Sequence, residues 1–229
     1  MPKVTEEYIQ NKKNMIVEAA YKLCLRKTVS TVTMQDIINE TGLSQGGIYR
    51  FYKDVDAIFS DMWLFLRQKE NIKPQVDEIF AMTNKESAGV IINRLFELLG
   101  DFMTRELMGI EKLDFEINVL AMNDSERVKK ILSGIPGVGN MEYLMSHFYK
   151  YIGEQIHAGI LKPRVTEDEL FSYIKSAFSG VQMTSLIFNC YSPIDKKGVN
   201  NFKPDIQLKI LNKTVCYLLG VADEEIRVC

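Results

Sequence analysis

The sequence is poor in the residues that form metal sites. It contains two histidines, His147 and His157, and four cysteines, none of which lies in a CxxC pair or near a histidine. A zinc site needs three or four such ligands at suitable spacing. We therefore expect no metal, no other cofactor and no disulfide, with the cysteines as free thiols in a reducing compartment.

Long apolar segments are also missing. The longest stretch without a charged residue, residues 176–194, is only about half apolar. A membrane-spanning helix needs about 20 predominantly apolar residues, and the amino terminus has no apolar signal-peptide stretch. We expect a cytoplasmic protein that is neither exported nor inserted into a membrane.

The motifs of common enzymes are absent as well. Gly134, Gly137 and Gly139 match neither a dinucleotide-binding pattern nor a P-loop, and the chain has no G-x-S-x-G or H-E-x-x-H. Across its 229 residues, 46% hydrophobic and 25% charged, the composition is that of an ordinary globular protein. We expect a folded protein that is not an enzyme.

What the sequence does contain is helical periodicity from end to end. Between residues 9 and 24, apolar residues recur at steps of three, four and seven, which is typical of one face of a helix. Asp54 or Asp56 opens a longer helix, and further helices are expected over residues 87–106, 111–123, 141–160, 167–190 and 204–219. These patterns predict an all-α protein, with a head of short helices followed by a larger helical bundle.

Charge divides the chain in the same way. Residues 1–53 hold eight Lys/Arg against five Asp/Glu, whereas the rest of the chain is acidic overall. A basic end is what nucleic-acid binding requires, because contacts to phosphates supply much of the affinity. We therefore expect a domain over residues 1–53 that differs in role from residues 54–229.

The most informative segment is residues 33–52. Thr33 and Asp36 form a capping-box pattern, Gly42 ends the short helix that follows, and Ser44 starts another that runs to about Phe51. A short glycine-containing turn between two short helices is the geometry of a helix-turn-helix. Four apolar residues would hold the two helices together: Ile37, Ile38, Leu43 and Ile48.

The second of these helices has an unusual outward face, formed by Gln45, Gly46, Gly47, Tyr49 and Arg50. Gln45 and Arg50 carry donors that can read base edges in the major groove. Each glycine inside a helix costs about 1 kcal/mol relative to alanine. Either the backbone must approach DNA closely there, or the glycines allow tight packing between helices.

Residues 9–60 resemble the amino-terminal domain of TetR-family transcriptional regulators. The matching positions cover about a quarter of the chain: Ile16, Ala19, Ala20, Leu23, Thr33, Ile37, Gly42, Leu43, Ser44, Gly46, Ile48, Tyr49, Phe51, Tyr52 and Ile58. Three positions depart from the family pattern. Val55 stands where a phosphate-binding lysine is usual, Gly47 where a Thr or Ser is usual, and Ile38 where an Ala is usual.

The resemblance implies a homodimer whose two recognition helices enter successive major grooves of a pseudo-palindromic double-stranded DNA operator. It places Thr33 near a phosphate, together with Tyr49 or Tyr52. The residues that it turns toward the groove are Ser44, Gln45, Gly46, Gly47 and Arg50, with Lys53 at the DNA backbone. The paired helices of the dimer would be residues 141–160 and 167–190.

The body would then hold a small-molecule effector. Flexible methionines and aromatic rings can line an adaptable apolar cavity, and the candidates are Phe102, Met103, Phe115, Met122, Phe148 and Met183. Ordinary core packing is the alternative for each of them. Glu116 lies within an apolar helix, where it could pair with a cationic ligand or with Arg105, or could face solvent.

Together these features predict a DNA-binding transcriptional regulator that is controlled by an apolar or amphipathic small molecule. A repressor is favoured over an activator only by the habit of the family. The alternative is a helical carrier of small molecules whose head does not bind DNA. Salt-sensitive binding to DNA distinguishes the two.

Overall fold

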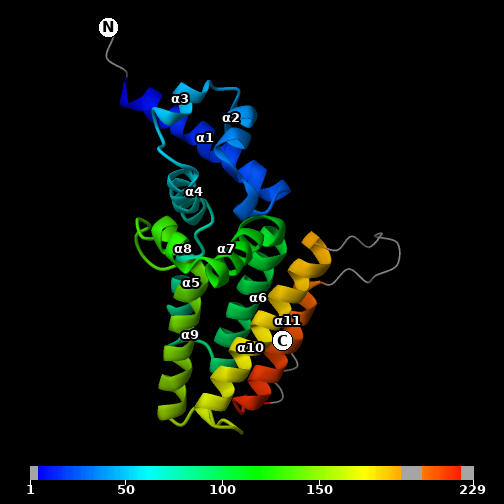
Figure 1. Ribbon diagram of the computed structural model, residues 1–229. Coiled ribbons are helices and arrows are strands. Elements are labelled where there is room, and N and C mark those ends of the chain that lie inside the picture. Colours follow the sequence, from blue (N-terminus) through cyan, green and yellow to red (C-terminus); the bar gives the residue numbers. More distant parts are fainter. Residues whose placement is uncertain (1–4, 192–202, 223–229) are drawn as a thin grey trace. The chain divides into compact units, whose positions relative to one another are not determined.

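The computed structural model describes residues 5–191 and 203–222, and over these ranges the chain is all-helical, with no strand (Figure 1). The predicted fold class is confirmed. The described part of the chain has no helix of sufficient length and apolar character to cross a bilayer. Of its cysteines, Cys24 and Cys216 are buried and Cys190 is half-buried, and Cys229 lies outside the described residues.

The chain folds into two compact units. The first contains the chain as far as Glu70 together with Lys112–Gly137, and the second contains Asn71–Glu111 and the chain from Val138 onward. The predicted boundary after Lys53 separates the chain by function and stays a prediction. By its contacts the first unit extends further, because it takes in three more helices.

The first unit is built on a long helix, α1 (Glu6–Arg26), and a short 3-10 turn, η1 (Val29–Thr31). Its remaining helices are α2 (Met34–Thr41), α3 (Gln45–Tyr49), α4 (Val55–Lys69), α7 (Lys112–Asn123) and α8 (Ser125–Leu132). Side chains of α1, α2 and α4 that are fully or almost fully buried form its core, among them Ile16, Ala20, Ile37, Phe59 and Trp63. This core fixes α2 against α1, and Ile48 of α3 is fully buried.

The helix boundaries of this unit follow the capping signals in the sequence. Both hydrogen bonds of the capping box between Thr33 and Asp36 are formed, and Gly42 ends α2 with a left-handed φ of 66°. Ser44 caps α3, and Asp54 caps α4 by accepting a hydrogen bond from the Ala57 amide at 2.8 Å. The end of α3 differs from the prediction, because the helix stops at Tyr49 and not at about Phe51.

The second unit is a bundle of longer helices. It comprises α5 (Lys73–Phe80), α6 (Ala88–Glu106), the π-helical segment η2 (Leu107–Glu111), α9 (Asn140–His157), α10 (Glu167–Leu186), the π-helical segment η3 (Ile187–Tyr191) and α11 (Pro204–Leu218). Helix α11 packs along both α6 and α10, and α5 packs against α6 and α9. Between α6 and α11, Asn212 donates a hydrogen bond to Asn93 at 2.7 Å.

Candidate functional site

The start of α2 is rigidly held. The Thr33 hydroxyl oxygen accepts a hydrogen bond from the Asp36 amide at 3.2 Å, and the Thr33 amide donates to the Asp36 carboxylate at 2.9 Å. Lys27, at the end of α1, pairs with the same carboxylate at 2.5 Å. The bond from Lys27, followed by those from Thr33, lowers the pKa of Asp36 to about 2. Thr33 itself is exposed at this helix start.

Helix α3 presents the face that the sequence predicted. Gln45, Gly46, Tyr49 and Arg50 are exposed, Gly47 is half-buried, and Ile48 is fully buried beneath them. Within the described residues, no carboxylate or other side chain is hydrogen-bonded to the amide of Gln45 or the guanidinium of Arg50. Their donors are therefore available to an external partner.

The two glycines of α3 differ in the space around them. A Cβ atom added at Gly46 would meet nothing within 4 Å, so helix packing does not require a glycine there. A Cβ at Gly47 would lie 3.2 Å from the Ser44 Oγ, which accepts the Gly47 amide hydrogen at 3.1 Å. The tight-packing interpretation is therefore wrong for Gly46, while Gly47 sits close to the capping hydroxyl.

Tyr52 does not lie on this surface. Its side chain is 4% exposed, and its hydroxyl donates to the Asp61 carboxylate at 2.8 Å. Lys13 pairs with the same carboxylate at 3.2 Å. Burial and the neighbouring Asp61 raise the pKa of Tyr52, so the hydroxyl keeps its proton. Of the two tyrosines that the resemblance offered for a phosphate, only Tyr49 is exposed.

The first turn of α4 has no lysine, as the sequence indicated. Lys53 is exposed beside it, and Val55 is half-buried as the first helical residue. The nearby cation Lys130, from α8, is 3.1 Å from Asp54, whose carboxylate caps the helix. Lys53 is thus the exposed basic side chain in the short connection between α3 and α4.

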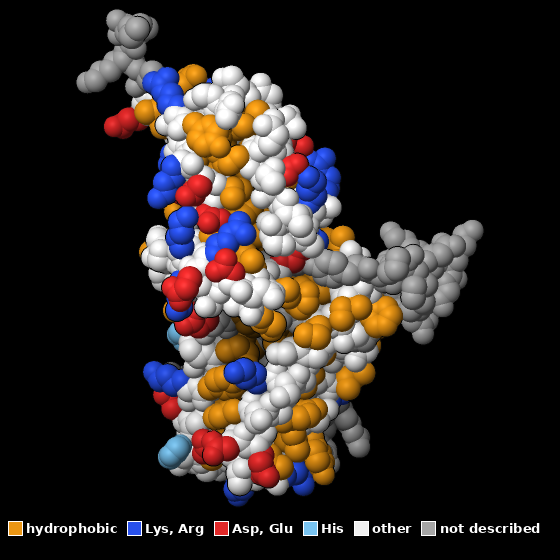
Figure 2. All heavy atoms as spheres, viewed as in Figure 1, with side chains coloured by type: hydrophobic (Ala, Val, Ile, Leu, Met, Phe, Trp, Pro, Cys, Tyr) orange, Lys and Arg blue, Asp and Glu red, His pale blue; other side chains and the backbone are white. Residues whose placement is uncertain are grey.

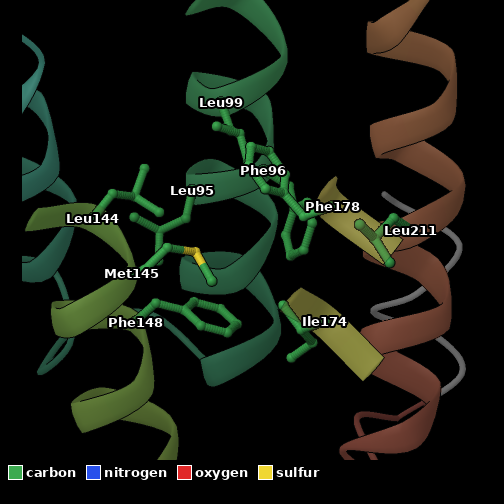
Figure 3. A pocket seen from close by; sticks show the side chains of 9 residues that line it. All are labelled: Leu95, Phe96, Leu99, Leu144, Met145, Phe148, Ile174, Phe178 and Leu211. Carbon is green, nitrogen blue, oxygen red and sulfur yellow. The ribbon is translucent and has the colours of Figure 1, made fainter. Parts of the chain in front are cut away.

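An apolar cavity of about 20 Å³ lies inside the second unit. Its lining comes from four helices, α6, α9, α10 and α11 (Figure 3). The lining side chains are Leu95, Phe96, Leu99, Leu144, Met145, Phe148, Ile174, Phe178 and Leu211, none of them polar. A space of this size holds about one water molecule, so the four helices leave little room between their side chains.

Of the candidate ligand residues, only Phe148 lines this cavity. Phe102 and Met103 are buried in α6 outside its lining, and Phe115 lies on α7 in the first unit. Met122, at 84% exposed, and Met183, at 48% exposed, face outward. These five residues therefore lie outside the cavity lining, because residue type alone does not say which way a helix turns each side chain, and a role for them in ligand binding stays a prediction.

For Glu116 the structure contradicts two of the three alternatives, while a role in ligand binding stays a prediction. Its carboxylate is buried, accepts from the Lys112 ammonium at 2.7 Å and accepts from the Val29 amide at 2.6 Å. It therefore neither faces solvent nor pairs with Arg105, which instead contacts Glu106 at 3.3 Å. The spacing of Lys112 and Glu116, four residues apart on one helix, was the signal that could have identified the pair.

Apolar side chains gather over α10 and α11 on the surface of the second unit (Figure 2). The exposed ones on the two helices and on η3 are Tyr173, Met183, Ile187, Phe188, Ile206, Ile210 and Tyr217. Helix α9, predicted as a partner of α10 at a dimer interface, has no large exposed apolar side chain in this part of the structure. Leu170, Ile174 and Phe178 of α10 point into the core instead.

No protein-family model matches this chain. Over 58 residues it is 36% identical to the uncharacterized HTH-type transcriptional regulator YfiR of Bacillus subtilis (strain 168), a match that covers 25% of this chain and 28% of that protein. The chain thus spans under a third of the length of this relative.

Solved structures match over almost the whole chain. A TetR transcription regulator from Haloarcula marismortui aligns over 92% of this chain and 97% of its own, with a TM-score of 0.59 and 14% identity. GusR from Salmonella enterica aligns over 95% and 98%, with a TM-score of 0.53 and 15% identity. A protein from Rhodococcus sp. assigned to the TetR family aligns over 90% and 98%, with a TM-score of 0.60 and 11% identity. The chain therefore has the fold of the TetR family of transcriptional regulators.

Proposed function

We propose that this protein is a DNA-binding transcriptional regulator of the TetR type whose recognition helix is α3. The observation that carries the proposal is the exposed face of α3, where Gln45 and Arg50 offer unpaired donors beside a glycine that packing does not require. The sequence match to an HTH-type regulator supports the same conclusion. The protein would act in the cytoplasm, where its DNA lies.

The residues of this surface divide into base-reading and anchoring groups. The Arg50 guanidinium suits the O6 and N7 acceptors of guanine, and the Gln45 amide suits the N6 and N7 edge of adenine. Tyr49, Thr33, Ser44 and Lys53 lie around them at exposed positions and would contact phosphates. The main chain at Gly46 and Gly47 would come closest to the groove.

A homodimer would present two such surfaces. Its interface would be the apolar face of α10 and α11, because isolated exposed apolar residues are common but a row of them on two adjacent helices indicates a partner surface. A second copy bound there related by a twofold axis makes the operator a pseudo-palindrome. The half-sites would then lie one helical turn apart, about 34–36 Å.

The effector would enter the apolar cavity between α6, α9, α10 and α11. Its lining offers no hydrogen-bond partner, so the buried part of the ligand would be apolar. Because the cavity is too small for more than about one water molecule, the ligand would favour a conformer in which these helices have separated. A repressor would release its operator in that conformer.

The decisive experiment is fluorescence anisotropy with a labelled duplex from upstream of the protein's own gene, titrated with salt after small molecules have been extracted from the purified protein. We expect tight binding that weakens steeply with salt, and weaker binding in Arg50→Ala. Arg94→Ala is the matched control, because Arg94 is an exposed arginine on α6 in the other unit. An absence of binding at low salt would refute the proposal and favour a small-molecule carrier.

A further inference from the structure

Three buried charged residues lie where the chain passes from the second unit to the first. Glu111 is the last residue of the first segment of the second unit, Asn71–Glu111. Lys112 follows it as the first residue of α7, where the chain returns to the first unit. Glu111, Lys112 and Glu116 are 3%, 5% and 7% exposed, and among the described residues they are the charged side chains that are buried. Burying charged side chains is costly unless they are paired, so we expect each of the three to have a partner. We refer to these three as the junction residues.

In the first unit, two junction residues bind the main chain at the end of α1. The Lys112 ammonium donates to the Cys24 carbonyl at 2.7 Å and to Glu116 at 2.7 Å. The other oxygen of the Glu116 carboxylate accepts from the Val29 amide at 2.6 Å. Cys24 lies in the last turn of α1 and Val29 opens η1, so α7 holds both sides of the connection that leads into α2.

This connection sets where the helix-turn-helix begins. Val29 and Val32 are buried, and Thr33 follows directly as the cap of α2. Burial also raises the pKa of the Cys24 thiol to about 12, with a further upward contribution from Glu116. Cys24 and Val29 are both fully buried, so a shift of α7 would move the main chain at these two residues with it.

In the second unit, the third junction residue is bound to α10. The Gln182 amide donates to the Glu111 carboxylate at 2.6 Å. Gln182 lies one turn beyond Phe178, which lines the apolar cavity. Between α6 and Glu111 the backbone leaves helical geometry at Gly109, where φ is −106° and ψ is −108°. The chain can therefore change direction here while Glu111 stays attached to α10.

We infer that the junction residues are positioning residues that connect the state of the cavity to the placement of the recognition helix. A shift of α10 relative to α6 moves Glu111, the next peptide bond carries the movement into α7, and Lys112 and Glu116 pass it to the connection between α1 and α2. This inference rests on the proposed function. By linkage the effect is reciprocal, so DNA bound at α3 must also alter α10.

The test is hydrogen–deuterium exchange of the full-length protein with and without the upstream duplex. In the wild type we expect slower exchange in α2 and α3, together with a changed exchange rate in residues 107–116 and 178–191. In Gln182→Met we expect DNA still to slow exchange in α2 and α3 but no longer to change the exchange rate of residues 178–191. The double variant Lys112→Met/Glu116→Met removes the bonds from α7 to Cys24 and Val29. We expect it also to abolish the DNA-induced change at residues 178–191.

Asp114→Asn is the matched control. Asp114 lies on α7 between Lys112 and Glu116 and accepts a hydrogen bond from the Trp63 indole of α4 at 3.2 Å. An asparagine retains that acceptor, so the distant response is expected to survive. Gln182 is half-buried in the second unit, so its variant provides a test even if the double variant does not fold.

Three outcomes overturn the inference. A distant response that persists in Gln182→Met refutes the connection, and so does a wild type that protects α2 and α3 without any change at 178–191. Both leave the proposed function standing. A wild type in which DNA changes nothing at α3 refutes the proposed function, and the junction inference fails with it.

Discussion

The substitution Gly46→Ala is expected to stabilise the protein and weaken its binding to DNA. A Cβ at this position meets nothing within 4 Å, and the glycine does not have a positive φ. Alanine therefore fits without strain and lowers the conformational entropy of the unfolded chain. The gain is about 0.5–1 kcal/mol, which for a chain of this size raises the Tm by about 1–4 °C.

The effect on DNA has the opposite sign. If the main chain of α3 approaches the floor or wall of the groove at van der Waals distance, the added methyl group must displace either the helix or a contact. A displaced contact at a specific site costs about 1–3 kcal/mol, equivalent to a loss of roughly tenfold or more in affinity. The assay pairs a melting curve with fluorescence anisotropy on the same preparation.

Gly153→Ala is the control for this experiment. Gly153 lies inside α9 in the second unit, and a Cβ there also meets nothing within 4 Å. It should raise the melting temperature by a similar amount and leave the affinity for DNA unchanged. If Gly46→Ala is more stable and binds DNA as well as the wild type does, the main chain of α3 does not approach the duplex and our explanation of this glycine is wrong.

Three further predictions concern other parts of the structure. Arg50→Ala should cost about 1–3 kcal/mol of DNA binding and relax base preference at one position, and an unchanged preference in a binding-site selection would contradict that role. The bonds that lower the pKa of Asp36 from 3.8 to about 2 stabilise the folded state fully above pH 4, and this stability is lost as pH falls through about 2. In an acid titration followed by circular dichroism, Asp36→Asn should lack this loss of stability. Identical acid transitions in the variant and the wild type would refute the role of Asp36. Ile210→Glu places a charge at a position 55% exposed on α11, and sedimentation should show a monomer if that face binds a second copy.

Local sequence signals were sufficient for the helix-turn-helix. Its caps depend on side chains within three residues of each helix start, as Thr33, Ser44 and Asp54 show. The long helices were also predicted closely because their apolar periods extend over several turns. Two short helices, α5 and α8, were missed, since eight residues carry too few turns for a period to stand out.

The candidate site was predictable only where it is local. The exposed face of α3 follows from the period of one helix, but the direction of Tyr52 depends on Asp61 in the next helix. The cavity depends on the rotation of four helices about their axes, which residue type does not encode, and of the candidate residues only Phe148 lines it. Glu116 is buried by a partner on its own helix and by a main-chain amide 87 positions away.

The small size of the apolar cavity has a consequence for the concentration at which an effector would act. A ligand that binds only an opened conformer has an apparent Kd equal to its intrinsic Kd divided by the fraction of molecules that are open. If about one molecule in a hundred is open, the apparent Kd is roughly a hundred times the intrinsic Kd, and the regulator responds only at correspondingly higher ligand concentration. Substitutions that loosen the packing of Leu99 or Leu211 against the other lining residues would lower that concentration. The density of this core would thus set the sensitivity threshold of the regulator separately from its ligand selectivity.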